Sequence, residues 1–595
     1  MCRSCFSPLL LNAELLATSG GRLFEHGSYR PSRRNFVATS VGAASTIAAF
    51  SEQNRSFAAN AGADVIYRGG KIIPLPGSAS VKSIAIASGK ILALGSESAV
   101  MQYKSNNTTI IDLDGRILMP GFIDPHNHTV LSALILELLE DIGYTKFPTR
   151  GKMLAALRAL VTQTPPGHWI SCSNFDNLLQ GGDLSREELD AISTDHPIFV
   201  WYTNGHDACV NSAALKLAKI PENIGTLPGG GHFGRDSSGA LNGVAYEESA
   251  ILKFVSLFLP KLTPQLAAKA ISDYLKTAAA SGNTMVHEPG TLRSEWIEPF
   301  SKLSTRMMCR TSASLMYEDM KGFEPYRNLG PGSRGAQIPD TLFTLYGIKI
   351  VGDGSNQTLT GAQTQPYLNT TDKGKTNFDA NQMKEMVRDI YNAKLPVLIH
   401  CNGDYTIDIA LDAIEAAYNG STEYGINRIE HSTMVRLDQI QRMKRLNVQP
   451  SFLMNHVRYY GAAYRDDIFG PKRAETTDPA GWCVREGLPF TLHTDSPCSP
   501  IGALNLVSTA ITRRCEIDGS IIGRDQTVSL DQALRSVTID AAKQIGMGDR
   551  IGSLEKGKEA DFVILEQDPY KTDPDKIGSI KISETWVGGV KKYAS

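Results

Sequence analysis

An alternation of β-rich and helical segments, repeated eight times, is the feature that most constrains the fold of this chain. Helical patterns such as residues 381–394 and 405–418 separate the later β-rich segments. Eight strands that alternate with helices are typical of an α/β protein with a (β/α)8, TIM-like barrel. We expect the barrel strands at residues 117–125, 283–288, 310–316, 345–351, 396–401, 427–431, 448–453 and 489–494.

The spacing of these segments also predicts the domains of the chain. The gap between the first and second strands is far too long for one crossover, so residues near 145–265 are expected to be an insertion at the top of the barrel. Such an insertion is a candidate lid or substrate wall. The barrel with its insertion is assigned to residues 118–548. Short strands separated by glycine turns occupy residues 62–117 and 549–595, and we expect these two ends to build one small β-sandwich domain together.

The first 61 residues have the pattern of an export signal. Two arginines in the run 32–37 (SRRNFV) precede an apolar stretch of 14 residues, 37–50, which is too short to span a bilayer. Ala59-Asn60-Ala61 offers a small-x-small cleavage pattern. We interpret residues 1–61 as a twin-arginine signal peptide of a periplasmic or secreted bacterial protein. The alternative is a disordered basic N-terminus.

The net charge limits the classes of partner that we expect, and the cysteine pattern limits the kinds of disulfide and metal site. The chain has 60 Lys and Arg against 62 Asp and Glu, a net charge of −2, which gives no reason to expect nucleic acid or a membrane surface as a partner. No Cys-x-x-Cys pair follows the signal segment, so a disulfide framework or a thiolate zinc site is not expected. A small-molecule ligand fits this composition, and a homodimer is an open option.

Polar residues at the predicted strand ends form the candidate site. A single histidine, lysine or aspartate in such a position is more often structural. Here, however, the carboxyl ends of the barrel strands place all of them on one rim, where active sites of such barrels lie. Imidazole and carboxylate groups suit Zn²⁺, with Fe²⁺ and Mn²⁺ as alternatives. The candidate metal ligands are His126, His128, Lys349, His400, His431 and Asp495.

This set resembles the amidohydrolase superfamily, which is marked by His-x-His on strand one, a lysine on strand four, one histidine each on strands five and six, and an aspartate on strand eight. The resemblance covers residues 63–590 and is closest to the amidohydrolase-3 subgroup. That subgroup contains N-substituted formamide deformylases and many exported metal-dependent hydrolases. The matching stretches are Asn204-Gly205-His206, Gly347-Ile348-Lys349, Arg428-Ile429-Glu430-His431 and 552–561.

The resemblance implies a role for each ligand. His126 and His128 would hold one divalent metal with Asp495, and His400 and His431 would hold a second. Lys349, if carboxylated, would bridge the two ions. Whether one or two ions bind, and whether the lysine is modified, stays open.

The implied reaction is hydrolysis of a non-peptide C–N bond in an amide, formamide or cyclic amide. A metal-activated water would attack, with Asp495 as general base and later as proton donor to the leaving nitrogen. The second metal, His206 or His431 would polarise the scissile carbonyl. His206 as a structural residue is an alternative, and His456 is a further candidate for substrate contact.

Two other functions remain compatible with the sequence. One is a deaminase or carbon–oxygen hydrolase on the same metal centre, and the other is a catalytically inactive periplasmic binding protein. Two motifs differ from those of the subgroup. Its usual Asp-Gly-His is Asn204-Gly205-His206 in this chain, and its usual Ser-Asp is Thr494-Asp495. Both differences lie at positions that we expect to face the substrate. The sequence therefore leaves the identity of the substrate open.

Overall fold

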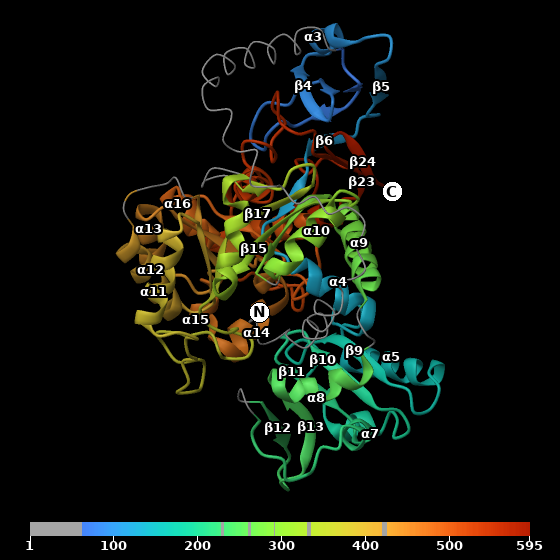
Figure 1. Cartoon of the computed structure of the whole chain (residues 1–595), viewed down its shortest axis with the longest axis vertical. Helices are drawn as coiled ribbons and strands as arrows, with labels where there is room; N and C mark the ends of the chain where they lie inside the picture. Colours follow the sequence, from blue (N-terminus) through green and yellow to red (C-terminus); the bar gives the residue numbers. More distant parts are fainter. Residues whose placement is uncertain are drawn as a thin grey trace, which may run out of the picture.

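The computed structural model describes residues 62–227, 231–259, 263–290, 292–329, 335–418, 420 and 425–595. The expected signal peptide lies outside these residues. Figure 1 shows three parts along the long axis of the molecule: a β-rich part made of both chain ends, a central barrel, and the insertion at the opposite end. Within the described ranges, no helix combines enough length and apolarity to cross a bilayer.

The central sheet is a barrel of eight parallel strands, as predicted. Its order is β21-β20-β19-β18-β17-β15-β14-β7, and every neighbouring pair runs parallel. Backbone hydrogen bonds join the two ends of this sheet: Asp495 N–H donates to His126 O, and His128 N–H donates to Ser496 O, both at 3.0 Å. The strands are β7 (Phe122–Asp124), β14 (Asn283–Pro289), β15 (Arg310–Met316), β17 (Phe343–Val351), β18 (Val397–Cys401), β19 (Asn427–His431), β20 (Val448–Phe452) and β21 (Thr491–Leu492).

Helices cover the barrel because their sequences place apolar residues on one face. In α11 (Ala380–Asn392), Met383, Val387 and Ile390 recur at helical spacing and are all buried. Asp379 begins this helix with a capping box, accepting from the backbone N–H of Gln382. Other barrel helices are α4 (Thr129–Leu138), α9 (Pro264–Ala280), α10 (Ile297–Ser304), α12 (Asp404–Ala417), α13 (Leu437–Arg445), α16 (Ala480–Glu486), α17 (Ala503–Thr512), α18 (Leu530–Ser536) and α19 (Ile539–Gln544).

The first predicted strand, 117–125, is two strands in the structure. Its first half, β6 (Ile117–Pro120), belongs to the sheet made by the chain ends, and only β7 belongs to the barrel. Gly121 lies between them, packed so closely on Thr284 that an added Cβ would come within 2.1 Å of its Cγ2. A continuous apolar run cannot reveal such a change of sheet, because both halves are equally buried.

The two chain ends share one β-domain, as predicted. β6 pairs antiparallel with β22, with Leu118 opposite Ile564. A second sheet packs on this one through Tyr67, whose ring lies 5.3 Å from Phe562 and 5.7 Å from Trp586. The two sheets are β4-β3-β1-β5 and β2-β6-β22-β23-β24, formed by β1 (Val65–Arg68), β2 (Lys71–Ile72), β3 (Ser83–Ala87), β4 (Lys90–Gly95), β5 (Thr109–Asp112), β22 (Phe562–Leu565), β23 (Ile582–Val587) and β24 (Val590–Ala594).

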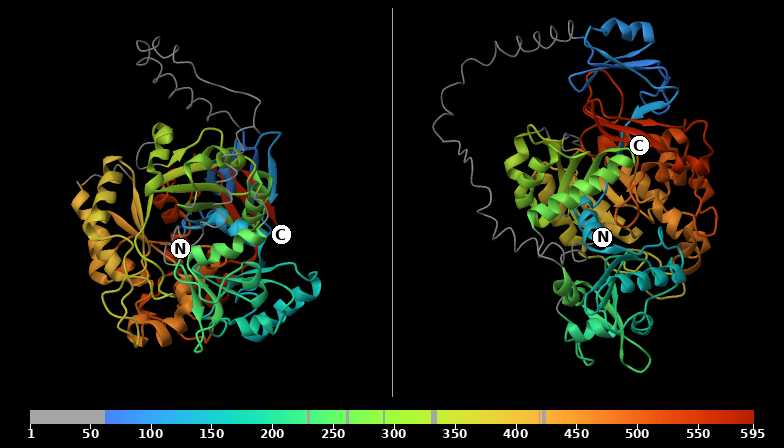
Figure 2. Two further views of the ribbon diagram at one scale, coloured as in Figure 1. Left: turned by 60° about the horizontal axis from the view of Figure 1, so that its bottom comes forward. Right: turned by 90° about the vertical axis from the view of Figure 1, so that its right-hand side faces the viewer.

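The long segment between β7 and β14 folds around a sheet of its own. Its order is β12-β13-β11-β10-β9-β8, and α5 and α8 pack on it with their own apolar clusters. Both views in Figure 2 place this sheet at the end of the barrel away from the terminal β-domain. Its elements are β8 (Glu140–Asp141), α5 (Arg150–Gln163), β9 (Ile170–Phe175), α6 (Arg186–Asp190), β10 (Ile198–Tyr202), β11 (Asp207–Val210), α7 (Ser212–Leu217), β12 (His232–Arg235), β13 (Leu241–Tyr246) and α8 (Glu248–Phe258).

Candidate metal centre

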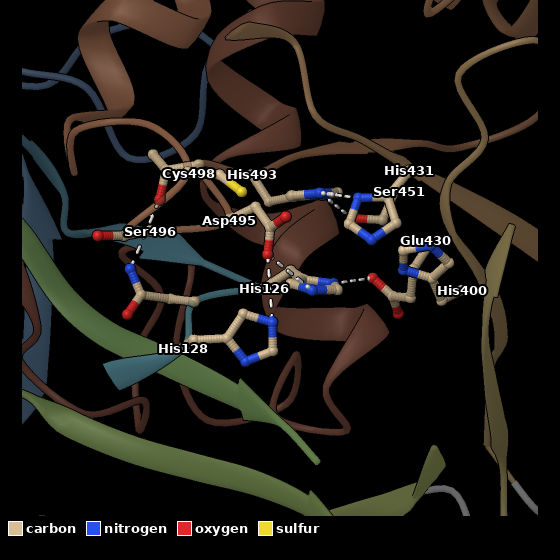
Figure 3. Close-up of polar contacts among 12 residues, drawn as sticks. His126, His128, His400, Glu430, His431, Ser451, His493, Asp495, Ser496 and Cys498 are labelled. Carbon is tan, nitrogen blue, oxygen red and sulfur yellow. Dashed lines mark hydrogen bonds and ion pairs between the residues drawn. The ribbon is translucent and has the colours of Figure 1, made fainter. Parts of the chain in front are cut away.

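Two histidines and an aspartate meet at one buried point. The Nε2 atoms of His126 and His128 lie 3.2 Å and 3.3 Å from the same oxygen, Oδ1 of Asp495 (Figure 3). Both histidines lie beyond the end of β7, in the loop that leads into α4, so strand alternation is not what aligns them. The sequence predicts their convergence, but the loop geometry produces it.

The second ring nitrogen of His126 and of His128, Nδ1, contacts a glutamate carboxylate. His126 Nδ1 lies 2.5 Å from Oε2 of Glu430, and the same oxygen accepts from Arg428 Nη2 at 2.8 Å. His128 Nδ1 lies 3.2 Å from Oε1 of Glu288. Carboxylates in this position fix the orientation of a metal-binding imidazole and raise its basicity. The Nε2 atoms are thereby turned toward Asp495.

His400 and His431 lie side by side next to this point. Their rings are 4.4 Å apart, and the His431 ring is 4.8 Å from that of His126. His400 Nε2 contacts the carbonyl oxygen of Gly354 at 3.0 Å, and His431 Nδ1 lies 3.2 Å from His493 Nε2. The remaining nitrogen of each ring, Nδ1 of His400 and Nε2 of His431, is therefore available to a ligand.

The last residue of β19 has an unusual backbone. His431 has φ 66°, in the left-handed region that side-chain-bearing residues rarely adopt. Extended strand geometry would send Glu430 and His431 to opposite faces. The left-handed turn at the strand end instead lets both contact the same cluster, Glu430 through His126 and His431 through His493. Asp495 is likewise left-handed, with φ 52°. Such strain is concentrated at functional sites.

The donor atoms of this cluster fit a metal ion. Buried atoms of this cluster that make no hydrogen bond within the described part of the chain include His400 Nδ1 and His431 Nε2. Burying polar atoms without partners costs free energy, which a cation would offset. Burial holds the pKa of His400 and of His431 well below the ordinary value, so both rings are neutral, the form that binds metals. Burial alone would raise the pKa of Asp495, but the neighbouring His126 holds it well below its usual range.

Lys349 is buried within β17, 2% exposed, on the strand beside His400. Burial lowers the pKa of its ammonium group to about 8. Gly290 makes room for it, because a Cβ there would lie 3.1 Å from the Cβ and Cγ of Lys349. The lysine side chain therefore loses its proton, and its charge, at a lower pH than an exposed lysine does.

His206 comes from the insertion, in the turn between β10 and β11. Its Nδ1 lies 3.3 Å from Oε2 of Glu247, and its backbone N–H donates to Oδ1 of Asn204 at 2.8 Å. His206 lines the same pocket as His431 and Asp495. The structure thus brings all seven predicted site residues to the rim of the barrel, or, for Lys349, into the strand beneath it.

Comparisons with known proteins show the family of the chain. The sequence model described as "Amidohydrolase family" matches residues 109–592, most of the chain. The chain belongs to the amidohydrolase family. It is 26% identical over 532 residues to the N-substituted formamide deformylase of Arthrobacter pascens, covering 86% of this chain and 95% of that protein. It is also 26% identical to the LONG AFTER FAR-RED 3 protein of Arabidopsis thaliana, covering 86% of this chain and 88% of that one.

Solved structures share this amidohydrolase fold. An uncharacterised metal-dependent hydrolase from Pyrococcus horikoshii matches with a TM-score of 0.67 at 22% identity, covering 86% of this chain and 99% of that one. A second, from Pyrococcus furiosus, matches with a TM-score of 0.65 at 22% identity, covering 85% and 100%. At this identity the likeness supports the architecture of the chain alone.

Three residues of the amidohydrolase centre were not expected from the sequence. Glu430 and His493 form, with His126, a second group whose atoms could hold a metal. We assign Glu430 and His493 to positioning His126 and not to binding a metal. Glu430 already pairs with Arg428, and the His493 ring stacks on the His126 ring at a centroid distance of 4.6 Å. The third, Glu288, holds His128. The sequence did contain a signal for Glu430, an arginine and a glutamate two residues apart within the predicted strand 427–431.

His456, the expected further substrate contact, lines the same pocket. Its Nδ1 lies 3.2 Å from Oγ1 of Thr433 and 3.6 Å from Oδ2 of Asp478. His287, which has no expected role in catalysis, is bound between the hydroxyls of Ser312 and Ser314 inside the barrel. The first of these histidines belongs to the pocket and the second to the core.

Proposed function

We propose that this protein is a metal-dependent hydrolase that cleaves a non-peptide C–N bond of an amide, formamide or cyclic amide. The observation that carries the proposal is the convergence of His126 and His128 on one oxygen of Asp495, in a buried pocket. The resemblance to a protein named N-substituted formamide deformylase supports the choice of bond. The substrate class comes from that relative rather than from the geometry.

In this proposal His126, His128 and Asp495 would hold one divalent ion, and His400 and His431 a second. Lys349 would join the two sites if carboxylated, a reaction that needs the uncharged amine and that its lowered pKa favours. Nitrogen and carboxylate donors favour Zn²⁺. A divalent ion here supplies Lewis acidity, which polarises a carbonyl and makes water a stronger nucleophile near neutral pH.

The side chains divide the proton transfers among them. The Asp495 carboxylate would accept a proton from the attacking water and return it to the leaving nitrogen. His206 would polarise the carbonyl oxygen through Nε2, with its ring held by Glu247, whose Oε2 lies 3.3 Å from Nδ1. The oxyanion is stabilised by donors that are already in place before the reaction.

The experiment that tests this function is the Asp495→Asn variant, assayed with a panel of amides and formamides. The amide side chain keeps the shape of the carboxylate but cannot accept the proton at neutral pH. We expect the fold to be retained and turnover to fall by about a thousandfold or more, combining the loss of general base catalysis with that of a metal ligand. Asp561→Asn, at a buried carboxylate in the terminal β-domain, is the matched control. Wild-type turnover in Asp495→Asn would overturn the proposed function.

We also propose that the protein is exported through the twin-arginine pathway. The support is the sequence pattern of residues 32–61 alone. N-terminal sequencing of protein recovered from the periplasm is the test, with a mature start near Gly62 expected. Replacing Arg33 and Arg34 by lysine should retain the protein in the cytoplasm, and unchanged export would contradict the proposal.

A further inference from the structure

A second, larger cavity adjoins the pocket of the histidine cluster. The inner pocket has a volume of about 40 Å³, and the outer cavity about 370 Å³. Roughly 10–15 Å³ is needed to hold one water molecule, so the inner pocket accepts little beyond the reacting group of a substrate. Ligand pockets in proteins are typically about 300–1,000 Å³, a range that includes the outer cavity.

The outer cavity lies between the insertion and the barrel. Tyr144 of the insertion and Tyr459, which follows β20, both line it, with their ring centroids 6.3 Å apart. Leu136 of α4 and Ile501, which follows β21, add aliphatic surface. These side chains come from three separate stretches of the chain, so the cavity exists only when the insertion is docked on the barrel.

Charge is nearly absent from this cavity. Among its lining residues, Lys146 and Asp141 neutralise each other at 3.0 Å. Asp176 is the remaining charged residue of the lining, and it accepts a hydrogen bond from Tyr460. A charged ligand group would find no unpaired partner here and would lose hydration on entry. The lining therefore favours an apolar ligand group.

The inner pocket and the outer cavity share part of their walls. Asp176, Thr203, Tyr460 and Cys498 line both. The Tyr460 hydroxyl donates to Oδ2 of Asp176 at 2.6 Å, which ties the π-helical turn η6 (His456–Tyr460) to the insertion. A molecule whose reacting bond lies beside Asp495 can therefore extend past this shared wall into the outer cavity.

We propose that the outer cavity binds the apolar alkyl or aryl substituent of the amide substrate, while the scissile bond lies in the inner pocket. This inference rests on the proposed function and adds the substrate class. The substituent could lie on the nitrogen or on the acyl side of the amide, and the chemistry of recognition is the same for both. Burial of each added methylene should raise kcat/KM about threefold to fourfold.

The test measures kcat/KM for two series on the full-length mature protein. One series is N-methyl-, N-butyl- and N-benzylformamide, and the other is acetamide, hexanamide and phenylacetamide. We expect kcat/KM to rise with substituent size in one of them, which also identifies the side of the substituent. Leu136→Asp should reduce the ratio of the largest to the smallest substrate by tenfold or more.

Leu217→Asp is the matched control, because both leucines are exposed near helix ends, 46% and 50%, and Leu217 lies on α7 away from the cavity. This control should keep the wild-type ratio. Ile501→Trp is a second test variant that fills the cavity and should lower the same ratio.

The outcomes separate this inference from the proposed function. If short and long amides are cleaved equally well, or if Leu136→Asp leaves the ratio unchanged, the cavity inference is wrong and the amidohydrolase function stands. If no amide is cleaved, the proposed function fails. The cavity is then judged by calorimetric binding of N-benzylmethanesulfonamide, a probe that needs no turnover. Binding that Leu136→Asp weakens supports the inference, and no binding to the wild type overturns it.

Discussion

At the scale of single residues, the centre depends on the groups behind its ligands. Glu430 and Arg428 are both fully buried, and their pairing places a carboxylate against Nδ1 of His126. Burial alone would raise the pKa of Glu430, but the Arg428 guanidinium holds it well below its usual range. A carboxylate that stays ionised fixes the His126 ring with Nε2 toward Asp495. Metal affinity should therefore depend on Glu430, although Glu430 is not a metal ligand in this account.

We predict that Glu430→Gln weakens metal binding by about tenfold to a hundredfold, the usual effect of losing such an outer partner. The variant should also lose about 3–5 kcal/mol of stability, because Arg428 remains buried without its anion. Metal titration and urea unfolding measure the two effects.

The control is Asp561→Asn, which breaks a comparable buried pair at 2.7 Å between Asp561 of the terminal β-domain and Arg310 of the barrel strand β15. It should cost similar stability and leave metal affinity unchanged. Equal metal affinities in the Glu430 variant and the wild type would show that Glu430 does not orient His126.

At the scale of elements, the crossing from β6 to β7 joins two domains through one glycine. Gly121 is buried against Thr284, the second residue of β14, and its backbone is not in the left-handed region. The close packing of the Thr284 side chain is therefore what requires glycine here.

We predict that Gly121→Ala costs about 1–3 kcal/mol, because the new methyl group overlaps Thr284 and the strands must move apart. Urea unfolding gives the change. Gly151→Ala in α5 is the control, since a Cβ there meets nothing within 4 Å and its backbone is also not left-handed. It should leave stability unchanged or raise it by up to about 1 kcal/mol. Equal stability of the two variants would refute the packing argument.

Elements were predictable where one local pattern decides them. The barrel strands follow from apolar runs such as 396–401, and the amphipathic pattern of α11 is visible in the sequence. The split of the first strand was not predictable, because both halves are apolar. The contact of Glu430 with His126 depends on a pairing over about 300 residues, and the turn at His431 depends on its left-handed backbone. Local periodicity contains neither kind of information.

At the scale of the whole molecule, residues of both the insertion and the barrel line the candidate site. The insertion lies at the end of the barrel away from the terminal β-domain (Figures 1 and 2). The contact of Tyr460 with Asp176 is one of the bonds between the insertion and the barrel. The barrel buries several histidines, and burial keeps them neutral. Burial is the first cause that holds the pKa well below its ordinary value at His287, His400, His431 and His493.

These shifts predict that the metal-free protein loses stability in mild acid. The unfolded chain takes up protons below about pH 6.5 and the folded histidines do not, so the free energy of unfolding falls as the pH drops below that value. Each such histidine contributes up to about 1.4 kcal/mol per pH unit. Urea unfolding with a chelator at pH 7.5 and 5.5 measures the change. Equal free energies of unfolding at the two pH values would contradict the claim that the buried histidines stay neutral in the folded protein.

The most direct test of the central claim is the metal content of the mature protein. After expression with added zinc, iron or manganese, elemental analysis should find at least one divalent ion per chain, and Asp495→Asn should hold less. Removing the ion with a chelator should abolish amide hydrolysis, and adding it back should restore it. The account would be contradicted if the protein bound no stoichiometric metal under any supplementation, or if the chelated protein kept full activity.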